Sequence, residues 1–279
     1  MKTKGMLTIA VTVLVLALVC PPVYGQDPET TKEPSGTASG DPEGWEFTVV
    51  PYIWMISLNG DATVKGNTQD VDVGFFDIFS GTDFAFGLQA HVEAWNKRKW
   101  GLWFDGTWVV LKVDDIGIPP MRFDLKTNIG YFEIGGLYNF IEKPFTTEPD
   151  SATWSLQGLV GTRITTMKVD FDFNVGPSVD QGQTWADPIL GGRAVFKFGS
   201  ENRWNFTFRG DFGGFGVGSD FTWKLMGLFG YDFHIGSVPS TFVFGYGAMY
   251  QDFESGSGPD KFAWDVTQHG PLFGLALHF

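Results

Sequence analysis

Regular alternation of apolar and polar residues is the feature that most constrains how this chain can fold. From Trp45 onward the alternation has a period of two, which is the period of a β-strand because successive side chains point to opposite faces of a sheet. Turn-forming residues divide the pattern into ten segments. These expected strands cover residues 45–58, 83–96, 99–113, 122–141, 152–171, 184–198, 203–217, 221–236, 240–254 and 261–279.

One parity of these segments is apolar and rich in aromatic residues. In the fifth segment it carries Trp154, Leu156, Val160 and Ile164. The chain has 28 Phe and 11 Trp, yet its mean hydropathy is only −0.02, and no stretch after residue 25 approaches the ~20 consecutive apolar residues of a membrane helix. A transmembrane β-barrel combines these properties, because lipid-facing and lumen-facing residues alternate. We expect an antiparallel up-and-down transmembrane β-barrel of about ten strands, with eight or twelve as alternatives and no charges on the lipid-facing parity.

The N-terminal residues indicate export. Residues 1–25 have the form of a secretory signal peptide, in which Lys2 and Lys4 precede an apolar run and cleavage follows Gly25. Lipidation at Cys20 is the alternative, and the bulky residues before that cysteine disfavour it. Cys20 is the only cysteine, so the mature chain is expected to have neither disulfides nor thiol chemistry.

Composition divides the exported chain into two parts. Residues 26–43 contain no aromatic residue and cannot contribute to a core, so we expect a disordered periplasmic tether followed by a barrel over residues 44–279. Without Lys2 and Lys4, 17 basic residues accompany 32 acidic ones, a net charge of −15. This charge argues against nucleic acid as a partner. It suits the lipid and lipopolysaccharide of a bacterial outer membrane, in which we expect a monomer.

The lumen-facing parity carries almost all charged residues of the central strands. Acidic residues prevail in the first four segments, and the Arg and Lys residues belong to the fifth to eighth, so closing the barrel places opposite charges face to face. The expected charge network comprises Glu93, Asp105, Glu133, Arg163, Arg193, Arg209, Asp211, Lys224 and Asp232. Because ten strands enclose a narrow lumen, these residues either fill it with ion pairs or line a constriction that selects small solutes.

Two segments superficially resemble ligand-binding motifs. The glycine-rich segment 210–218 is followed by neither the Lys nor the helix of a phosphate-binding loop, and we expect Gly216, Gly218 and Ser219 to form an outer turn. Residues 170–176 lack the glycine position and terminal Glu of a calcium loop, which leaves strand alternation as the main interpretation and weak divalent-cation binding as an alternative. No metal site and no cofactor are predicted.

Several single features carry further expectations. Asp265 and His269 are the best candidates for an acid–base pair, but no Ser is placed to act as their nucleophile, so we expect no enzyme. The apolar stretch 75–79 in the long outer connection 59–82 is expected to fold back as a lid or against the barrel rim. Pro51 removes a ladder hydrogen bond and predicts a bulge.

Two segments also resemble known outer-membrane sequences. The alternating residues Phe273–Phe279, ending on Phe, resemble the signal that outer-membrane barrels present to the barrel-assembly machinery. The run Gly210–Asp220, followed by Thr222 and Trp223, resembles a family of uncharacterised Gram-negative outer-membrane barrel proteins, and the similarity spans residues 45–279. The resemblance implies a cell outer-membrane location and transfers no functional residue.

Three functions remain open from the sequence. A narrow channel or transporter for small solutes is the leading hypothesis. A structural or surface-interaction protein with a plugged, salt-bridged lumen is the alternative, and an outer-rim enzyme that modifies lipid or peptide is the third.

Overall fold

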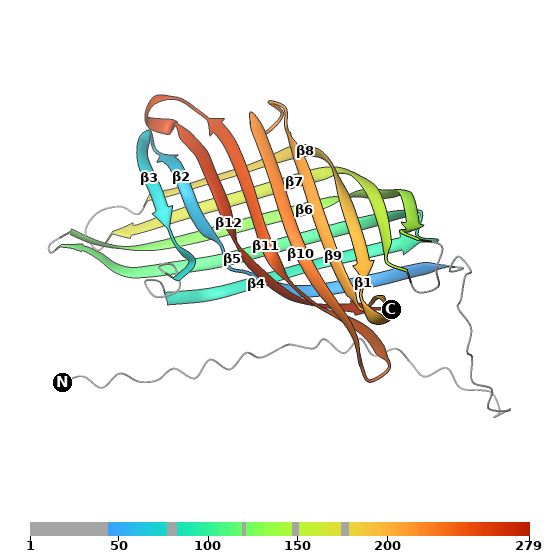
Figure 1. Ribbon diagram of the computed structural model, residues 1–279. Coiled ribbons are helices and arrows are strands. Elements are labelled where there is room, and N and C mark those ends of the chain that lie inside the picture. The colour runs from blue at the N-terminus through green and yellow to red at the C-terminus, as the bar shows by residue number, and fades with distance from the viewer. Residues whose placement is uncertain (1–43, 77–82, 119–120, 147–150, 174–178) are drawn as a thin grey trace, which may run out of the picture. The chain divides into compact units, whose positions relative to one another are not determined.

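The computed structural model describes residues 44–76, 83–118, 121–146, 151–173 and 179–279, and it forms an antiparallel sheet that closes on itself (Figure 1). The predicted signal peptide and tether lie outside these residues. The strands are β1 (Trp45–Trp54), β2 (Ser57–Val64), β3 (Asn67–Val73), β4 (Asp83–Asn96), β5 (Trp100–Ile118), β6 (Met121–Pro144), β7 (Thr153–Phe173), β8 (Val179–Phe198), β9 (Trp204–Gly214), β10 (Phe221–Ile235), β11 (Val238–Ser255) and β12 (Phe262–His278).

Ten of these strands form the barrel. β1 and β4 to β12 follow one another as hydrogen-bonded antiparallel neighbours, and β12 pairs with β1 to close the ring. The predicted ten-stranded β-barrel is therefore confirmed. Short 3-10 turns at Ser200–Asn202 (η1) and Gly258–Asp260 (η2) join neighbouring strands. No helix in the described part of the chain has both the length and the apolar composition needed to cross a membrane.

The two ends of the barrel differ in their connections. One end, here called the turn end, holds the beginning of β1, the end of β12 and short connections such as Lys97–Lys99. The opposite loop end holds the connections β2–β3, β9–β10 and β11–β12. β6 has 24 residues, more than twice the 9–11 residues with which a tilted strand crosses a bilayer, so the wall continues beyond a membrane-sized belt.

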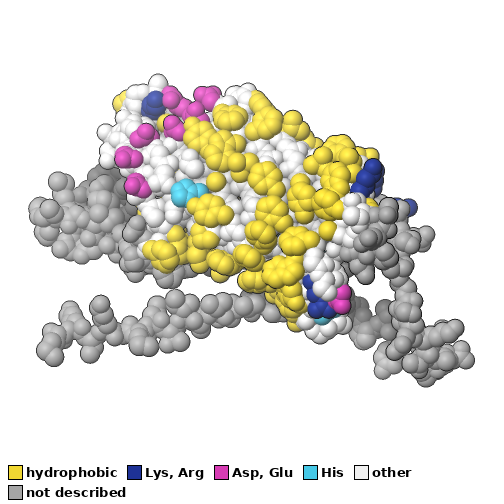
Figure 2. All heavy atoms as spheres, in the orientation of Figure 1, with side chains coloured by type: hydrophobic (Ala, Val, Ile, Leu, Met, Phe, Trp, Pro, Cys, Tyr) yellow, Lys and Arg dark blue, Asp and Glu magenta, His cyan; other side chains and the backbone are white. Residues whose placement is uncertain are grey.

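An apolar belt surrounds the barrel. Its large exposed residues on the predicted outward parity include Trp45, Phe47, Leu88, Trp108, Ile134, Val160, Leu190, Phe208, Leu225, Phe242, Tyr246 and Phe273. Figure 2 shows apolar side chains over one face of the barrel, with acidic side chains gathered toward the loop end. The expectation that the outward parity lacks charges is wrong toward the loop end, because this parity also carries Lys126, Lys168, Asp252 and Asp265. The charged residues stand where the strands extend past the belt.

Aromatic residues also mark the turn end. The rings of Trp45 and Trp100 meet edge to face at 4.8 Å, and Trp204 lies 4.9 Å from Tyr231. Trp95 differs from the other tryptophans at this end because its indole points into the lumen, where Nε1 donates a 2.7 Å hydrogen bond to Glu93 Oε2.

The first strand is longer than predicted. β1 and β2 pair with β12 in a single register, with Trp54 opposite Leu272 and Ser57 opposite His269. β3 then folds back along β2 as a hairpin. The interpretation of residues 59–82 as an outer loop is therefore wrong for residues 59–64 and 67–73, which are strands. One face of β2 carries Leu58, Ala62 and Val64, which pack against a buried apolar cluster, but Gly60 interrupts this alternation, and β3 has no apolar residue before Val71.

Pro51 causes no bulge. The pairing of β1 with β12 is interrupted at Val50 and Pro51 and resumes at Tyr52 opposite Gly274 in the same register. On the other side, Pro51 still lies opposite Ala90 of β4. The missing N–H is accommodated by losing ladder bonds without inserting a residue, so the predicted bulge is wrong.

Gly60 holds β2 close to β12. Its φ is 142°, and a Cβ added there would lie 2.1 Å from the Asp265 carbonyl oxygen. We expect Gly60→Ala to destabilise β2 by about 1–3 kcal/mol, seen as faster amide exchange at residues 57–64. Gly182→Ala is the matched control, since its nearest neighbour atom is 3.5 Å from the new Cβ. Equal exchange in the two variants would contradict the close approach.

Candidate functional site

The inward faces of seven neighbouring strands bring together most of the predicted charge network. β4 supplies Glu93, β5 Asp105 and β6 Glu133, while the facing strands β7 to β10 supply the cations. Ion pairs join these members into two neighbouring groups, one of Glu133, Arg163, Arg209, Asp211 and Lys224 and one of Glu93, Arg193 and Asp105, the last linked through His91. Four carboxylates thus accompany four Arg or Lys cations within one layer of the lumen.

Glu133 is the centre of this layer. Its Oε1 accepts hydrogen bonds from Arg163 Nε at 2.7 Å and from Lys224 Nζ at 3.2 Å. Its Oε2 accepts one from Arg209 Nη2 at 2.9 Å. Arg209 and Lys224 come from β9 and β10, so these bonds cross the lumen. Only 2% of Glu133 is exposed, and desolvated charges of this kind persist when they are paired and hydrogen-bonded.

Arg163 is fully buried and uses its whole guanidinium group. Besides Glu133, it donates to Asp211 Oδ1 from Nη2 at 2.7 Å and to Thr222 Oγ1 from Nη1 at 2.9 Å. Thr222 in turn donates to the Tyr250 carbonyl oxygen at 2.7 Å. Since three strands besides its own hold this one side chain, its position is tightly determined.

Arg209 is held by charge and by an aromatic ring. Its Nε donates to Asp211 Oδ2 at 3.1 Å, and its guanidinium carbon lies 4.3 Å from the centre of the Trp103 ring. Gly135 on β6 makes room for that indole, because a Cβ there would lie 2.9 Å from Trp103 Nε1 and 2.3 Å from the Val160 carbonyl oxygen. Gly135 is therefore part of the packing around the ion layer.

A second branch of the network lies nearer the turn end. Arg193 reaches across the lumen from β8 to bind both carboxylate oxygens of Glu93, with Nη2 at 3.0 Å from Oε2 and Nη1 bonded to Oε1. His91 lies between two carboxylates, with Nε2 at 2.8 Å from Glu93 Oε1 and Nδ1 at 3.1 Å from Asp105 Oδ2. Tyr52 donates to Asp105 Oδ1 at 2.9 Å. His91 shares its parity with Glu93, which was the available signal for its role.

Asp232 lies apart from this network. It accepts hydrogen bonds from Thr241 Oγ1 at 2.6 Å and from Asn205 Nδ2 at 3.2 Å, and it lines a cavity at the turn end. Sequence parity placed it correctly inside the barrel, but its height along the axis separates it from the ion layer.

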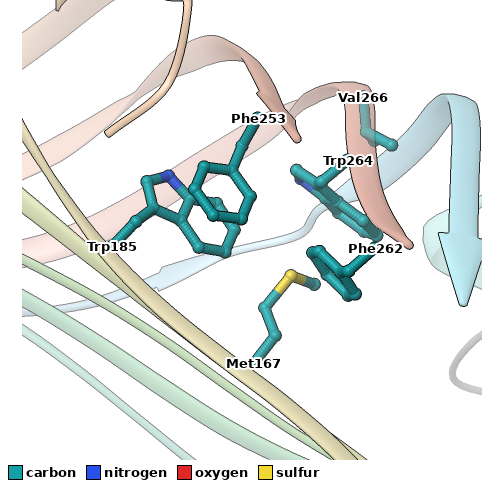
Figure 3. Close-up of a cluster of buried hydrophobic side chains, with 6 residues drawn as sticks. All are labelled: Met167, Trp185, Phe253, Phe262, Trp264 and Val266. Atoms are coloured by element: carbon teal, nitrogen blue, oxygen red, sulfur yellow. The ribbon is translucent and has the colours of Figure 1, made fainter. Parts of the chain in front are cut away.

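An apolar layer fills the lumen on the loop-end side of the ions. Figure 3 shows its six buried residues, Met167, Trp185, Phe253, Phe262, Trp264 and Val266. Trp185 and Phe253 stack in parallel with ring centres 4.1 Å apart. These side chains come from β7, β8, β11 and β12, so the layer packs across the lumen between these two pairs of strands.

The glycine-rich segment forms part of this closure. Its residues 215–220 make the predicted outer turn between β9 and β10. Ser219 is fully buried, where its N–H and Oγ donate to the two carboxylate oxygens of Asp187 at 2.6 and 2.9 Å, and its Oγ accepts a bond from Trp185 Nε1. Gly218 permits this approach, since a Cβ there would lie 2.6 Å from the Ala186 carbonyl oxygen. Parity indicated that Asp187 faces inward, but no pattern indicated its bonds to a turn.

A cavity of about 1420 Å³ occupies the turn-end half of the lumen. Charged residues of the ion layer, including Glu93, Arg193 and Arg209, form its floor, and residues of the turns line its mouth. At that mouth, hydrogen bonds to the Glu201 carboxylate raise the pKa of the exposed Arg203 guanidinium. Open space in the lumen therefore ends at the ion layer.

The remaining candidates do not assemble into a site. His269 Nδ1 lies 2.6 Å from Tyr246 OH and its Nε2 2.7 Å from Asn59 Oδ1, on the outer surface, and neither contact involves Asp265. Asp170 forms an ion pair with Lys168 at 2.9 Å. No group of three His, Cys, Asp or Glu residues that could hold a metal ion occurs in the described ranges.

The apolar stretch 75–79 is described only in part. The Phe75 N–H donates to Ser57 Oγ at 3.1 Å, and the Phe76 side chain is 79% exposed. Residues 77–79 lie outside the described residues, so the expected lid or rim packing stays a prediction.

Comparison with known proteins found similarity only among solved structures. No protein-family model matches the chain, and no curated protein matches it. The attachment invasion locus protein Ail of Yersinia pestis aligns over 85% of this chain and 100% of its own, with 11% identity and a TM-score of 0.31. A Pseudomonas aeruginosa FadL homologue aligns over 84% of this chain and 89% of its own, with 10% identity and a TM-score of 0.29. The monoaromatic hydrocarbon channel CymD aligns over 85% of this chain and 88% of its own, with 7% identity and a TM-score of 0.22. These values do not bear on what this chain binds or transports.

Proposed function

We propose that this chain is an outer-membrane β-barrel with a closed lumen, acting as a structural or surface-interaction protein. The apolar belt supports membrane insertion, because a barrel has no other use for large exposed residues at every second position of each strand. The predicted signal peptide and the alternating residues Phe273–Phe279 suit export and assembly by the outer-membrane machinery.

The observation that carries the closed lumen is the complete burial of Arg163 among Glu133, Asp211 and Thr222. A solute path through the middle of the barrel would hydrate this guanidinium. The apolar layer of Figure 3 is a second barrier in series with the ion layer. A wall that extends past the belt and carries acidic side chains at the loop end supports a role at the cell surface.

The channel hypothesis is favoured only by the cavity at the turn end. That cavity would serve as an entrance, but a solute leaving it toward the loop end would have to displace the Arg193–Glu93 pair and then the ion pairs of Glu133. We therefore rank the channel hypothesis second. The hydrogen bonds of His269 go to Tyr246 and Asn59 and not to Asp265, so this pair is not proposed as an acid–base site.

Purified barrel inserted in a planar lipid bilayer is expected to pass no stepwise ion current. Glu133→Gln is expected to remain closed as well, because the apolar layer persists when the ion layer is weakened. Heat-modifiable gel migration and resistance to extraction from vesicles establish that each protein is folded and inserted. Steady unitary currents from the unmodified protein, with an ion selectivity that Glu133→Gln alters, would instead support the constriction.

A further inference from the structure

The cavity at the turn end has two chemically different walls. Its polar wall is made by β4 and β7 to β9. Consecutive strands β10, β11, β12 and β1 make a second wall, whose deeper part is apolar and contains Met226, Leu228, Val243, Leu272, Ala276 and Val50, while polar residues such as Asp232 and Thr241 lie toward the mouth. Several of these residues also pack on the buried cluster around Trp54 and Met249. A plain aqueous vestibule gains nothing from a contiguous apolar wall, since each Å² left in water costs about 25 cal/mol.

Charges near the mouth are largely paired. Among the cavity-lining cations, Arg98 pairs with Glu46 and Arg203 with Glu201. Arg193 and Arg209, deeper in the cavity, belong to the ion layer. Of the cavity-lining cations that the structure describes, Lys197 alone has no carboxylate within ion-pair distance.

An acidic residue lies close to this lysine. Lys197 is the register partner of Asn205, and Asn205 Nδ2 donates to Asp232 Oδ1 at 3.2 Å. The other hydrogen-bond donor to Asp232 is the neutral Thr241 hydroxyl group. A cation on β8 and a carboxylate on β10 therefore lie on either side of Asn205 of β9, each able to bind an opposite charge.

We propose that this cavity binds a zwitterionic single-chain amphiphile of the lysophospholipid class. Its phosphate would bind Lys197, its ammonium group Asp232, and its acyl chain would cover the apolar wall from Val243 to Leu228. The cavity volume of about 1420 Å³ exceeds the 300–1,000 Å³ typical of small-ligand sites, which suits a ligand with a long chain. This site does not require a closed or an open lumen, so it stands independently of the proposed function.

The test uses lysophosphatidylethanolamine that carries a photoreactive diazirine in its acyl chain. After irradiation with the full-length purified protein in detergent, peptide mass spectrometry identifies the labelled residues. Because parity separates the two faces of each strand, we expect label on the inward residues Met226, Leu228 and Val243. Label confined to the outward residues Leu225 and Phe242 would overturn the proposal, because it reports the belt alone.

Charge variants test the headgroup. Lys197→Glu is expected to lower inward labelling about tenfold, whereas Lys143→Glu, an exposed residue outside the cavity, leaves it unchanged. The Lys197→Asp/Asp232→Lys double exchange is expected to restore labelling. Unchanged inward labelling in Lys197→Glu, or equal displacement of the probe by a fatty acid and by lysophosphatidylethanolamine, would contradict zwitterion recognition.

Discussion

Replacing Glu133 with glutamine is expected to lower the free energy of unfolding by about 3–5 kcal/mol. Arg163, Arg209 and Lys224 all donate to this carboxylate, and all three are buried, Arg163 completely, so little water can replace its charge. The loss therefore comes from buried cations left uncompensated, more than from the hydrogen bonds themselves. Urea unfolding of the barrel refolded in lipid vesicles, followed by tryptophan fluorescence, measures it.

Glu46→Gln is the matched control for this substitution. Glu46 pairs with Arg98 at 3.5 Å at the turn end, where the two side chains are 40% and 59% exposed. Exposed ion pairs contribute about 0–1 kcal/mol, so the free energy of unfolding of this variant should be close to that of the unmodified protein.

Lys224→Met combined with Glu133→Gln keeps the test informative if Glu133→Gln alone does not fold. Removing Lys224, one of the three cations that lose the Glu133 carboxylate as partner, should recover part of the lost unfolding free energy. If the Glu133→Gln and Glu46→Gln barrels have the same free energy of unfolding, the ion layer is hydrated. This result would contradict the proposal of a closed lumen.

Alternation predicted the faces of the strands well because it depends on one property of the backbone. Every second side chain of a strand points the same way, so Glu133 and Arg163 could be assigned to the lumen and Val160 to the outside without knowing the pairing. The same rule places Trp95 inside, since it shares the parity of Glu93. Its indole donates to Glu93 there, although tryptophans at the ends of membrane strands commonly lie at the lipid interface.

The contacts across the lumen could not be predicted from alternation. Which cation meets Glu133 depends on strand tilt and on the stagger of the whole ring, quantities that no single segment contains. Parity placed Asp232 and Lys224 on the same face of β10, yet only Lys224 reaches the ion layer. The hairpin of β2 and β3 was missed because Gly60 interrupts the apolar face of β2 and because the first four residues of β3, Asn67 to Asp70, are polar.

Val160→Arg is expected to destabilise the barrel in vesicles by about 2–4 kcal/mol. Val160 is 61% exposed and lies opposite Leu190 of β8, another exposed apolar residue, so it occupies the belt well inside its turn-end edge at Trp154. An arginine at this position would either place its charge among the acyl chains without hydration or bring water into the hydrocarbon region of the bilayer. The measurement is the shift in the urea unfolding midpoint in bilayer vesicles.

Val217→Arg separates the effect of lipid from the effect of the substitution itself. Val217 is 73% exposed in the β9–β10 turn, beyond the belt, so its replacement should change the unfolding free energy by less than about 0.5 kcal/mol. The difference between the two variants isolates the cost of placing a charge in hydrocarbon, because both sites are exposed and start from the same residue type. If the two variants unfold alike in vesicles, the belt does not contact lipid, and the exposed apolar residues must instead be covered by another protein surface.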